Sequence, residues 1–144
     1  MGKMKYMSFL FFSMIFLTSC EDSQIVKIVI DGKLYQTPLE ESLKVESGDI
    51  TYFLKRYEGT ALDNYLNRGT LFERFFGSSG EYLNDLHAYL IKGSKIFENG
   101  KTHLYHFYKE GNDSQSIFIL ATCPYDINEK YKEEIFRVVK SAHF

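Results

Sequence analysis

Short runs of β-branched and aromatic residues, separated by turn residues, recur along the chain and predict β-strands. The first run covers residues 25–30 and is followed by Asp31-Gly32 and by Lys33-Leu34-Tyr35. Because Asp-Gly accepts the positive φ angles of a type I′ turn, this pattern predicts a β-hairpin. Pro38 interrupts its second arm, and residues 50–57, which mix Tyr, Phe, Ile and Thr, predict a further strand.

The apolar spacing becomes helical after Thr60. Thr60 and Asp63 have the spacing of a capping box, with Asp in place of the usual Glu. Gly69 and Gly77 can each end a helix, so this segment predicts two short helices or one kinked helix. Residues 78–91 form a third candidate helix, although the last four of them are equally compatible with the start of a strand.

The last third of the chain has the clearest strand pattern. Asn99-Gly100, the preferred pair for a type I′ turn, is followed by residues 101–109 and predicts a second hairpin. The continuous apolar run within 116–123 predicts a central strand that is covered on both faces. We therefore expect an antiparallel meander in this part of the chain.

An amphipathic helix is predicted over residues 128–142, at the end of the chain. Asp126 and Glu129 have the spacing of a capping box at its start. Its apolar residues share one stripe, which we expect to cover a face of the sheet. These residues are Tyr131, Ile135, Val138, Val139 and Ala142.

Together these elements predict an α+β fold, in which helices pack on an antiparallel sheet to form a single-domain sandwich over residues 25–144. The sheet combines the N-terminal hairpin with the C-terminal meander. Over residues 95–144 the pattern resembles the small PsbP-like domains, in which a three-stranded meander runs directly into a final helix. The resemblance rests on the order of elements and not on a catalytic motif.

The first twenty residues have the features of a bacterial export signal. Lys3 and Lys5 precede an apolar run at 7–17, which is too short to span a bilayer. The run ends in Leu17-Thr18-Ser19-Cys20, which resembles a bacterial lipobox. The resemblance implies that residues 1–19 are a signal peptide and that Cys20 carries acyl chains. The alternatives are an ordinary secretory signal with a chance cysteine, and an uncleaved membrane anchor.

A lipoprotein of this kind would be anchored in the cell envelope and face the periplasm, from either the inner or the outer membrane. Several acyl chains give stable anchoring, whereas one chain binds only marginally. Residues 20–24 then form a short tether, whose four residues after Cys20 reach about 14 Å. We therefore expect the domain to lie close to the lipid headgroups.

Composition narrows the class of protein further. Hydrophobic residues at 44% exclude a disordered chain, and a mean hydropathy of −0.25 excludes several membrane spans. The chain has 17 basic and 19 acidic residues, and two of the basic ones lie in the leader. The mature chain then carries a net charge of −4, which gives no electrostatic reason to bind nucleic acid.

Candidate chemical groups are few. His103 and His106 would share a metal on a helix, but in a strand a spacing of three places them on opposite faces. Cys123 falls on the same strand face as the apolar residues at alternate positions before it, which predicts a small buried residue and not a reactive thiol. No nucleophile elbow, phosphate loop or dinucleotide fingerprint occurs. We therefore expect no catalysis, no metal and no cofactor.

Aromatic residues are unusually frequent, at 17% of the chain. Tyr105 and Phe107 share a strand face, and with Tyr125 they predict an exposed patch suited to protein recognition. The competing expectation is that this strand face packs under the final helix.

The leading functional hypothesis is a non-enzymatic lipoprotein that binds another protein at the periplasmic face, like immunity or exclusion factors. The alternatives are an accessory subunit of an envelope or secretion complex, and a carrier that holds a small ligand in a cleft between sheet and helices.

Overall fold

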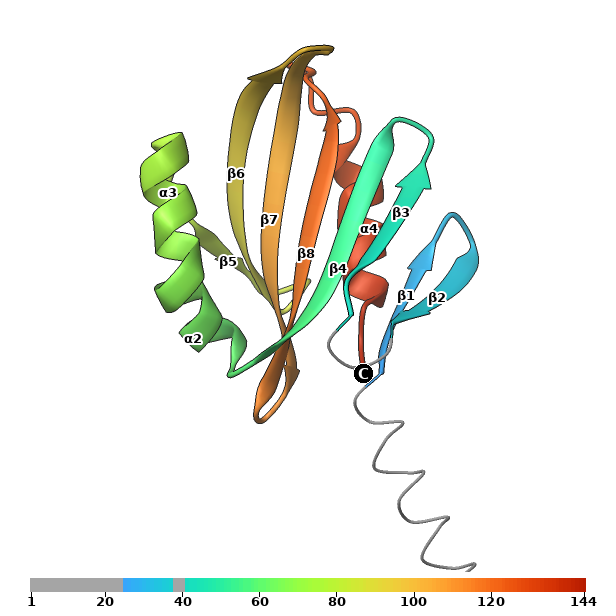
Figure 1. Ribbon diagram of the computed structural model, residues 1–144, viewed down its shortest axis with the longest axis vertical. Helices are drawn as coiled ribbons and strands as arrows, with labels where there is room; N and C mark the ends of the chain where they lie inside the picture. The colour runs from blue at the N-terminus through green and yellow to red at the C-terminus, as the bar shows by residue number, and fades with distance from the viewer. Residues whose placement is uncertain (1–24, 38–40) are drawn as a thin grey trace, which may run out of the picture.

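The central element of the computed structural model, which describes residues 25–37 and 41–144, is a six-stranded antiparallel sheet (Figure 1). The strands lie in the order β3-β4-β8-β7-β6-β5. This sheet, a separate hairpin and the helices form one small α+β domain, as predicted. The bounds are β3 Leu43–Ser47, β4 Ile50–Glu58, β5 Glu81–Leu83, β6 Ala88–Phe97, β7 Gly100–Asn112 and β8 Gln115–Pro124.

The predicted first hairpin is confirmed as β1 (Val26–Ile30) and β2 (Lys33–Thr37). Asp31 and Gly32 both have positive φ angles, of 53° and 75°, as a type I′ turn requires. Strand β1 also pairs with the end of the chain, because the backbone N–H of Lys27 donates to the carbonyl of His143 at 2.7 Å. The two ends of the domain are thereby joined.

The segment after Thr60 forms one continuous helical run: α2 (Ala61–Asn64), a π-helical turn η1 (Tyr65–Gly69) and α3 (Thr70–Phe76). The Thr60 hydroxyl accepts a hydrogen bond from the N–H of Asp63 at 3.1 Å, which confirms the predicted cap. Gly77, with φ of 65°, ends α3 as expected.

Gly69 does not end a helix, contrary to one of our expectations. Its φ is −68°, and the helical chain continues through it. The glycine favours close packing here, since a Cβ atom would lie 2.8 Å from the Cδ1 of Ile91 and 3.2 Å from the ring of Tyr108. The kinked helix is therefore the correct alternative.

Two strands differ from the sequence expectation. The region 81–97 forms β5 and β6, so the strand alternative is correct and the third helix is absent from that region. Strand β3 was not predicted, because its sequence shows little strand pattern. Only Val45 is buried, and the other residues of the strand are exposed or half-buried. The second hairpin joins β6 and β7, but its turn residues are Glu98 and Asn99, one position earlier than predicted.

The final helix, α4 (Lys132–Ser141), begins later than predicted. The expected capping box is wrong: the carboxylate of Asp126 accepts from the N–H of Asn128 at 2.9 Å, and Glu129 has a φ of 54°, which no helix accommodates. Glu129 instead pairs with Lys92 and with Lys132. The predicted apolar stripe is confirmed, because Ile135, Val138, Val139 and Ala142 are buried.

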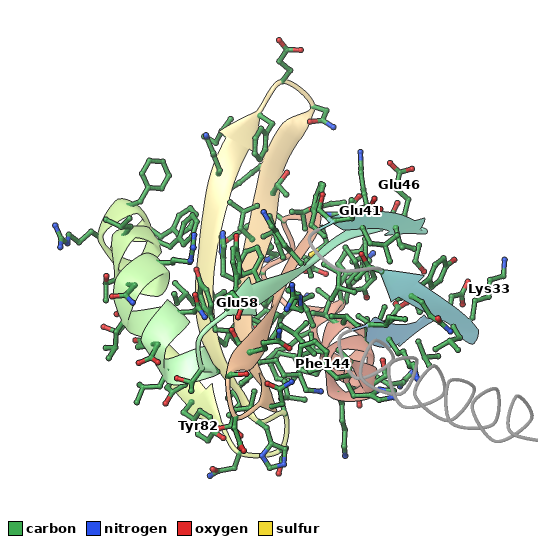
Figure 2. The ribbon with its side chains drawn as sticks, turned by 60° about the horizontal axis from the view of Figure 1, so that its bottom comes forward. Lys33, Glu41, Glu46, Glu58, Tyr82 and Phe144 are labelled. Carbon is green, nitrogen blue, oxygen red and sulfur yellow. The ribbon has the colours of Figure 1, made fainter. Side chains whose placement is uncertain are left out.

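The main hydrophobic core lies between one face of the sheet and the layer formed by α4 and the β1–β2 hairpin. Ile28, Phe107 and Ile135, from those three regions, are completely buried in it. Figure 2 shows Lys33 and Glu46 pointing outward from the β2 and β3 side of the domain. No helix in the described part of the chain has the length and hydrophobicity to cross a membrane.

Phe107→Ala tests this core. The side chain is completely buried and its ring lies edge-on to that of Phe136, with centroids 5.9 Å apart. We expect the substitution to lower the free energy of unfolding by about 3 to 5 kcal/mol, measured by urea denaturation of residues 20–144 carrying Cys20→Ser. Leu34→Ala, at a side chain that is 56% exposed, is the control and should change it by less than about 0.5 kcal/mol. Equal effects would contradict the core assignment.

Candidate binding groove

The structure does not place the predicted aromatic patch on the surface. Tyr105 and Phe107 share a strand face, as predicted, but both have zero exposure and lie in the core beneath α4. The competing expectation is therefore correct for these two residues. Tyr125 is exposed at 41%, and its ring packs on His103 at 4.5 Å and beneath the ammonium of Lys101 at 3.9 Å. The three residues do not form one accessible surface.

The two predicted cysteine roles have different outcomes. Cys20 lies outside the described residues, so its lipidation stays a prediction. Cys123 is 2% exposed, and burial raises the pKa of its thiol to about 11. Cys123 is thus a small buried residue with a protonated thiol at neutral pH, as expected.

His103 and His106 lie on opposite faces of β7, as the strand spacing predicted. His103 faces the α4 side, where its Nε2 lies 2.8 Å from the carbonyl oxygen of Asp126. His106 faces the other side, where its ring lies 4.2 Å from that of Phe72. Within the described part of the chain, no group of three or more His, Cys, Asp or Glu side chains is placed to hold a metal ion.

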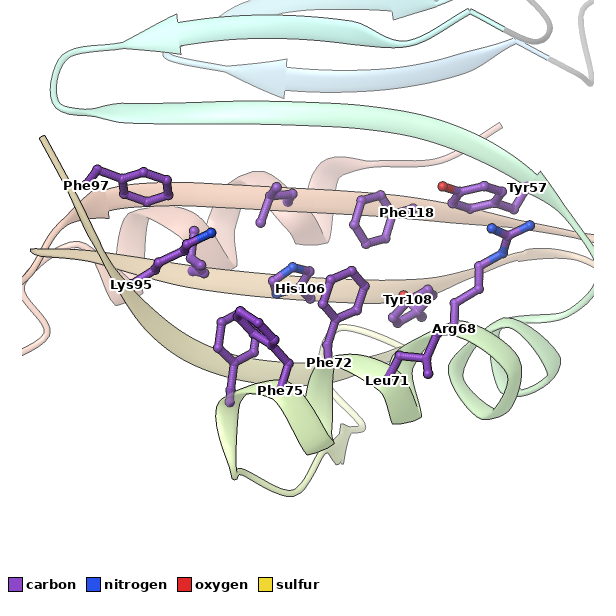
Figure 3. A pocket seen from close by; sticks show the side chains of 13 residues that line it. Tyr57, Arg68, Leu71, Phe72, Phe75, Lys95, Phe97, His106, Tyr108 and Phe118 are labelled. Carbon is purple, nitrogen blue, oxygen red and sulfur yellow. The ribbon is translucent and has the colours of Figure 1, made fainter.

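The sheet face that carries His106 is only partly covered, and it holds a groove of about 700 Å³ (Figure 3). The floor of the groove consists of β7, β8 and the end of β4, and its wall is α3. Nearly all its side chains are aromatic or aliphatic. They are Tyr57, Arg68, Leu71, Phe72, Phe75, Phe76, Lys95, Phe97, Leu104, His106, Tyr108, Phe118 and Leu120.

Strand alternation builds the floor. Leu104, His106 and Tyr108 of β7 alternate with the core residues, and the register of β7 with β8 places Leu120 beside His106 and Phe118 beside Tyr108. One sheet thus supplies the main core on one face and the groove on the other.

The wall is fixed to the sheet at both of its ends. At its start, the side-chain amide of the buried Asn64 donates to the carbonyl of Glu58 and to the hydroxyl of Ser116, both at 2.9 Å, which holds α2 against β8. At its end, α3 lies over β6, where the ring of Phe76 occupies the space in which a Cβ on Gly93 would lie, at 2.4 Å. The helix α3 therefore covers β6 and leaves the floor on β7 and β8 open.

The rim of the groove exposes apolar side chains. Leu71 and Phe75 of α3 are 61% and 68% exposed, and Phe97, near the β6–β7 turn, is 44% exposed. A contiguous apolar surface of this kind is uncommon on monomeric domains and marks binding sites. The sequence contains a signal for it, since residues 72–76 hold three phenylalanines in a helix too short to bury them all.

His106 is the polar group at the centre of the floor. It is 4% exposed and lies against Phe72, Phe76 and Phe118. Burial lowers the pKa of its ring to about 4, and a weaker interaction with the backbone of Ile91 acts in the opposite direction. The imidazole is therefore neutral at pH 7, and the centre of the groove carries no charge.

One cationic side chain lies at each end of the groove (Figure 3). At one end, the guanidinium carbon of Arg68 is 4.2 Å from the centre of the Tyr57 ring. At the other end, the ammonium of Lys95 is 5.8 Å from the Phe75 ring and 5.5 Å from the Phe97 ring. Among the described residues, no carboxylate lies within ion-pair distance of either cation.

A search against protein families, curated proteins and solved structures gave no match to this chain. The groove is therefore interpreted from its own geometry and chemistry.

The buried His106 predicts a pH dependence of stability. Because the folded-state pKa of about 4 lies below the ordinary 6.5, the unfolded chain binds a proton first as the pH falls. Stability from this group is complete above pH 6.5 and is lost between 6.5 and 4, by about 3 kcal/mol in total. Urea denaturation at pH 7 and pH 4.5 should show a smaller loss in His106→Phe than in wild type.

The matched control is His143→Gln, at an exposed histidine, which should keep the wild-type pH dependence. The assignment of His106 fails if His106→Phe and wild type lose the same stability over this pH range.

Proposed function

We propose that this chain is a lipid-anchored, non-enzymatic protein of the bacterial envelope that binds an elongated apolar ligand in the groove. The observation that carries the proposal is the uncovered aromatic floor between α3 and the sheet. Of the three functional alternatives drawn from the sequence, this geometry favours the carrier with a cleft between sheet and helices.

The dimensions of the groove support a ligand of small-molecule size. Its volume of about 700 Å³ falls within the range of about 300 to 1,000 Å³ that is typical of ligand pockets. The floor from Leu104 to Tyr108 spans four residue steps of one strand, or about 13 Å. A long and narrow apolar molecule fits this shape better than a compact one.

The composition of the groove supports binding over catalysis. Among the described residues that line it, there is no Ser, Cys, Asp or Glu side chain that would act as a nucleophile or as an acid–base pair. His106 is the only histidine there, and it lies among aromatic rings with no carboxylate to orient it. These side chains provide contact area and shape.

The proposed anchor is Cys20, and the tether after it is short. Ile25, the first described residue, leads into β1 at the end of the domain where the chain also finishes (Figure 1). The β6–β7 turn lies at the opposite end of the long axis. A groove whose floor follows β7 would then run from the membrane-proximal end towards the periplasm.

A protein partner of the immunity or exclusion type is the second candidate function. It is favoured by two exposed isoleucines, Ile96 near the tip of β6 and Ile127 after β8, which are 77% and 84% exposed. Both lie away from the start of β1, so a partner in the periplasm would be able to reach them. Neither residue lines the groove.

The anchor is tested by Cys20→Ser in cells labelled with radioactive palmitate. We expect wild type to take up label and to fractionate with membranes, and the variant to lose both properties, since the thiol is the proposed site of lipid attachment. Continued labelling of the variant would show that the lipoprotein proposal is wrong.

The groove is tested with Nile red, a neutral apolar dye whose fluorescence rises in apolar sites. Residues 20–144 carrying Cys20→Ser should bind it, and Phe75→Glu should weaken binding by about tenfold, because it places a charge on the exposed wall. Ile127→Glu, at an exposed residue outside the groove, should leave the affinity within about twofold. If dye binding is absent, or equally reduced in both variants, the groove is not the site.

A further inference from the structure

We infer that the ligand of the groove is a single-chain anionic amphiphile, whose head binds at Arg68 and whose acyl chain runs along the floor towards Phe97. This inference rests on the proposed function and names the class of ligand. It follows from three features of the groove. One end holds hydroxyl donors and a cation that has no carboxylate partner among the described residues, the middle is uncharged, and the far end is apolar.

The Arg68 end combines several hydrogen-bond donors. The Arg68 Nε donates to the side-chain oxygen of Asn64 at 3.2 Å, and Asn64 is itself fixed by its bonds to Glu58 and Ser116. Figure 3 shows the guanidinium between the rings of Tyr57 and Tyr108. The remaining guanidinium N–H groups are thus held at the groove end, where they would bind a carboxylate or phosphate.

The two tyrosines at this end reinforce the preference for an anion. The Tyr108 hydroxyl is protonated at neutral pH and can donate a hydrogen bond, and burial raises its pKa further, to about 12. Tyr57 and Tyr108 also enclose the ring of Phe118, at centroid distances of 5.8 and 5.2 Å. An acyl chain whose head is bound at Arg68 would therefore contact this aromatic surface directly next to the head site.

The rest of the groove suits an uncharged chain. His106 is neutral at pH 7 and lies midway along the floor, and its neighbours are Phe72, Phe118 and Leu120. The far end is formed by Phe97 and by the rim residue Phe75, both exposed. One acyl chain fits a volume of about 700 Å³ and a two-chain phospholipid does not. An extended chain continues past the roughly 13 Å of floor between Leu104 and Tyr108 towards Phe97.

Lys95 at the far end is a weaker site for the head. Its ammonium lies over the faces of Phe75 and Phe97, and no described hydroxyl lines the groove beside it. A lysine ammonium is a strongly hydrated point charge on a flexible stem, whereas the Arg68 fork is restrained by its hydrogen bond to Asn64 and by its contact with the Tyr57 ring. The geometry thus assigns the head to Arg68 and not to Lys95.

The test is displacement of Nile red at pH 8 by three amphiphiles with the same chain: hexadecanoate, hexadecanol and hexadecyltrimethylammonium. Wild type should bind hexadecanoate most tightly and the cationic amphiphile least tightly. Arg68→Gln should lower the affinity for hexadecanoate by about ten- to a hundredfold, because it removes a charged hydrogen-bonding partner. The same variant should change the affinity for hexadecanol by less than about threefold.

Two matched variants complete the experiment. Arg74→Gln removes an exposed arginine from the same helical run, outside the groove, and should leave all three affinities unchanged. Arg68→Lys keeps the charge without the fork and should show an intermediate loss. An unchanged melting temperature and an unchanged circular dichroism spectrum in the Arg68 variants show that their folds are intact.

The outcomes separate the two proposals. Equal affinity for hexadecanoate and hexadecanol, or equal effects of Arg68→Gln and Arg74→Gln, would overturn the anion assignment and leave the groove as a binding site. Nile red binding that none of the amphiphiles displaces would also overturn it, in favour of an apolar segment of a protein partner. Complete absence of Nile red binding would remove the proposed function itself.

Discussion

The path of the helical run 61–76 across the sheet decides which part of that sheet face stays open as a groove. Two contacts fix that path: Asn64 is hydrogen-bonded to Ser116 of β8 at one end, and Phe76 packs on Gly93 of β6 at the other. Between them, Gly69 permits the close approach of the run to Ile91. A helical segment fixed in this way covers the edge of one sheet face and leaves the remainder of that face open.

The two sheet faces therefore serve different purposes with the same strands. On one face, Tyr105 and Phe107 join α4 and the first hairpin in the core, which supplies the stability of the domain. On the other face, His106 and Phe118 lie beneath an incomplete cover. Strand alternation links the two faces, because a residue of β7 that points into the core is followed by one that points into the groove.

The sequence predicts the fold well where the signal is local. Asp31-Gly32 specifies its turn, and the amphipathic stripe of α4 specifies its buried face. The sequence predicts the fold poorly where tertiary contacts decide the local structure. Gly69 is a residue type that often ends helices, but here it lets a helix approach Ile91. The choice of Tyr105 and Phe107 as a surface was wrong for the same reason, since alternation shows which residues share a face but not which face is covered.

The central claim is that the open sheet face, and not the core face, receives the ligand. The most direct measurement is a set of intermolecular nuclear Overhauser effects between bound hexadecanoate and the ring protons of the domain, at neutral pH. We expect contacts from the chain methylenes to Phe72, His106 and Phe118, and none to the buried rings of Tyr105 and Phe107. Contacts confined to the exposed isoleucines and Tyr125, with none in the groove, would contradict it.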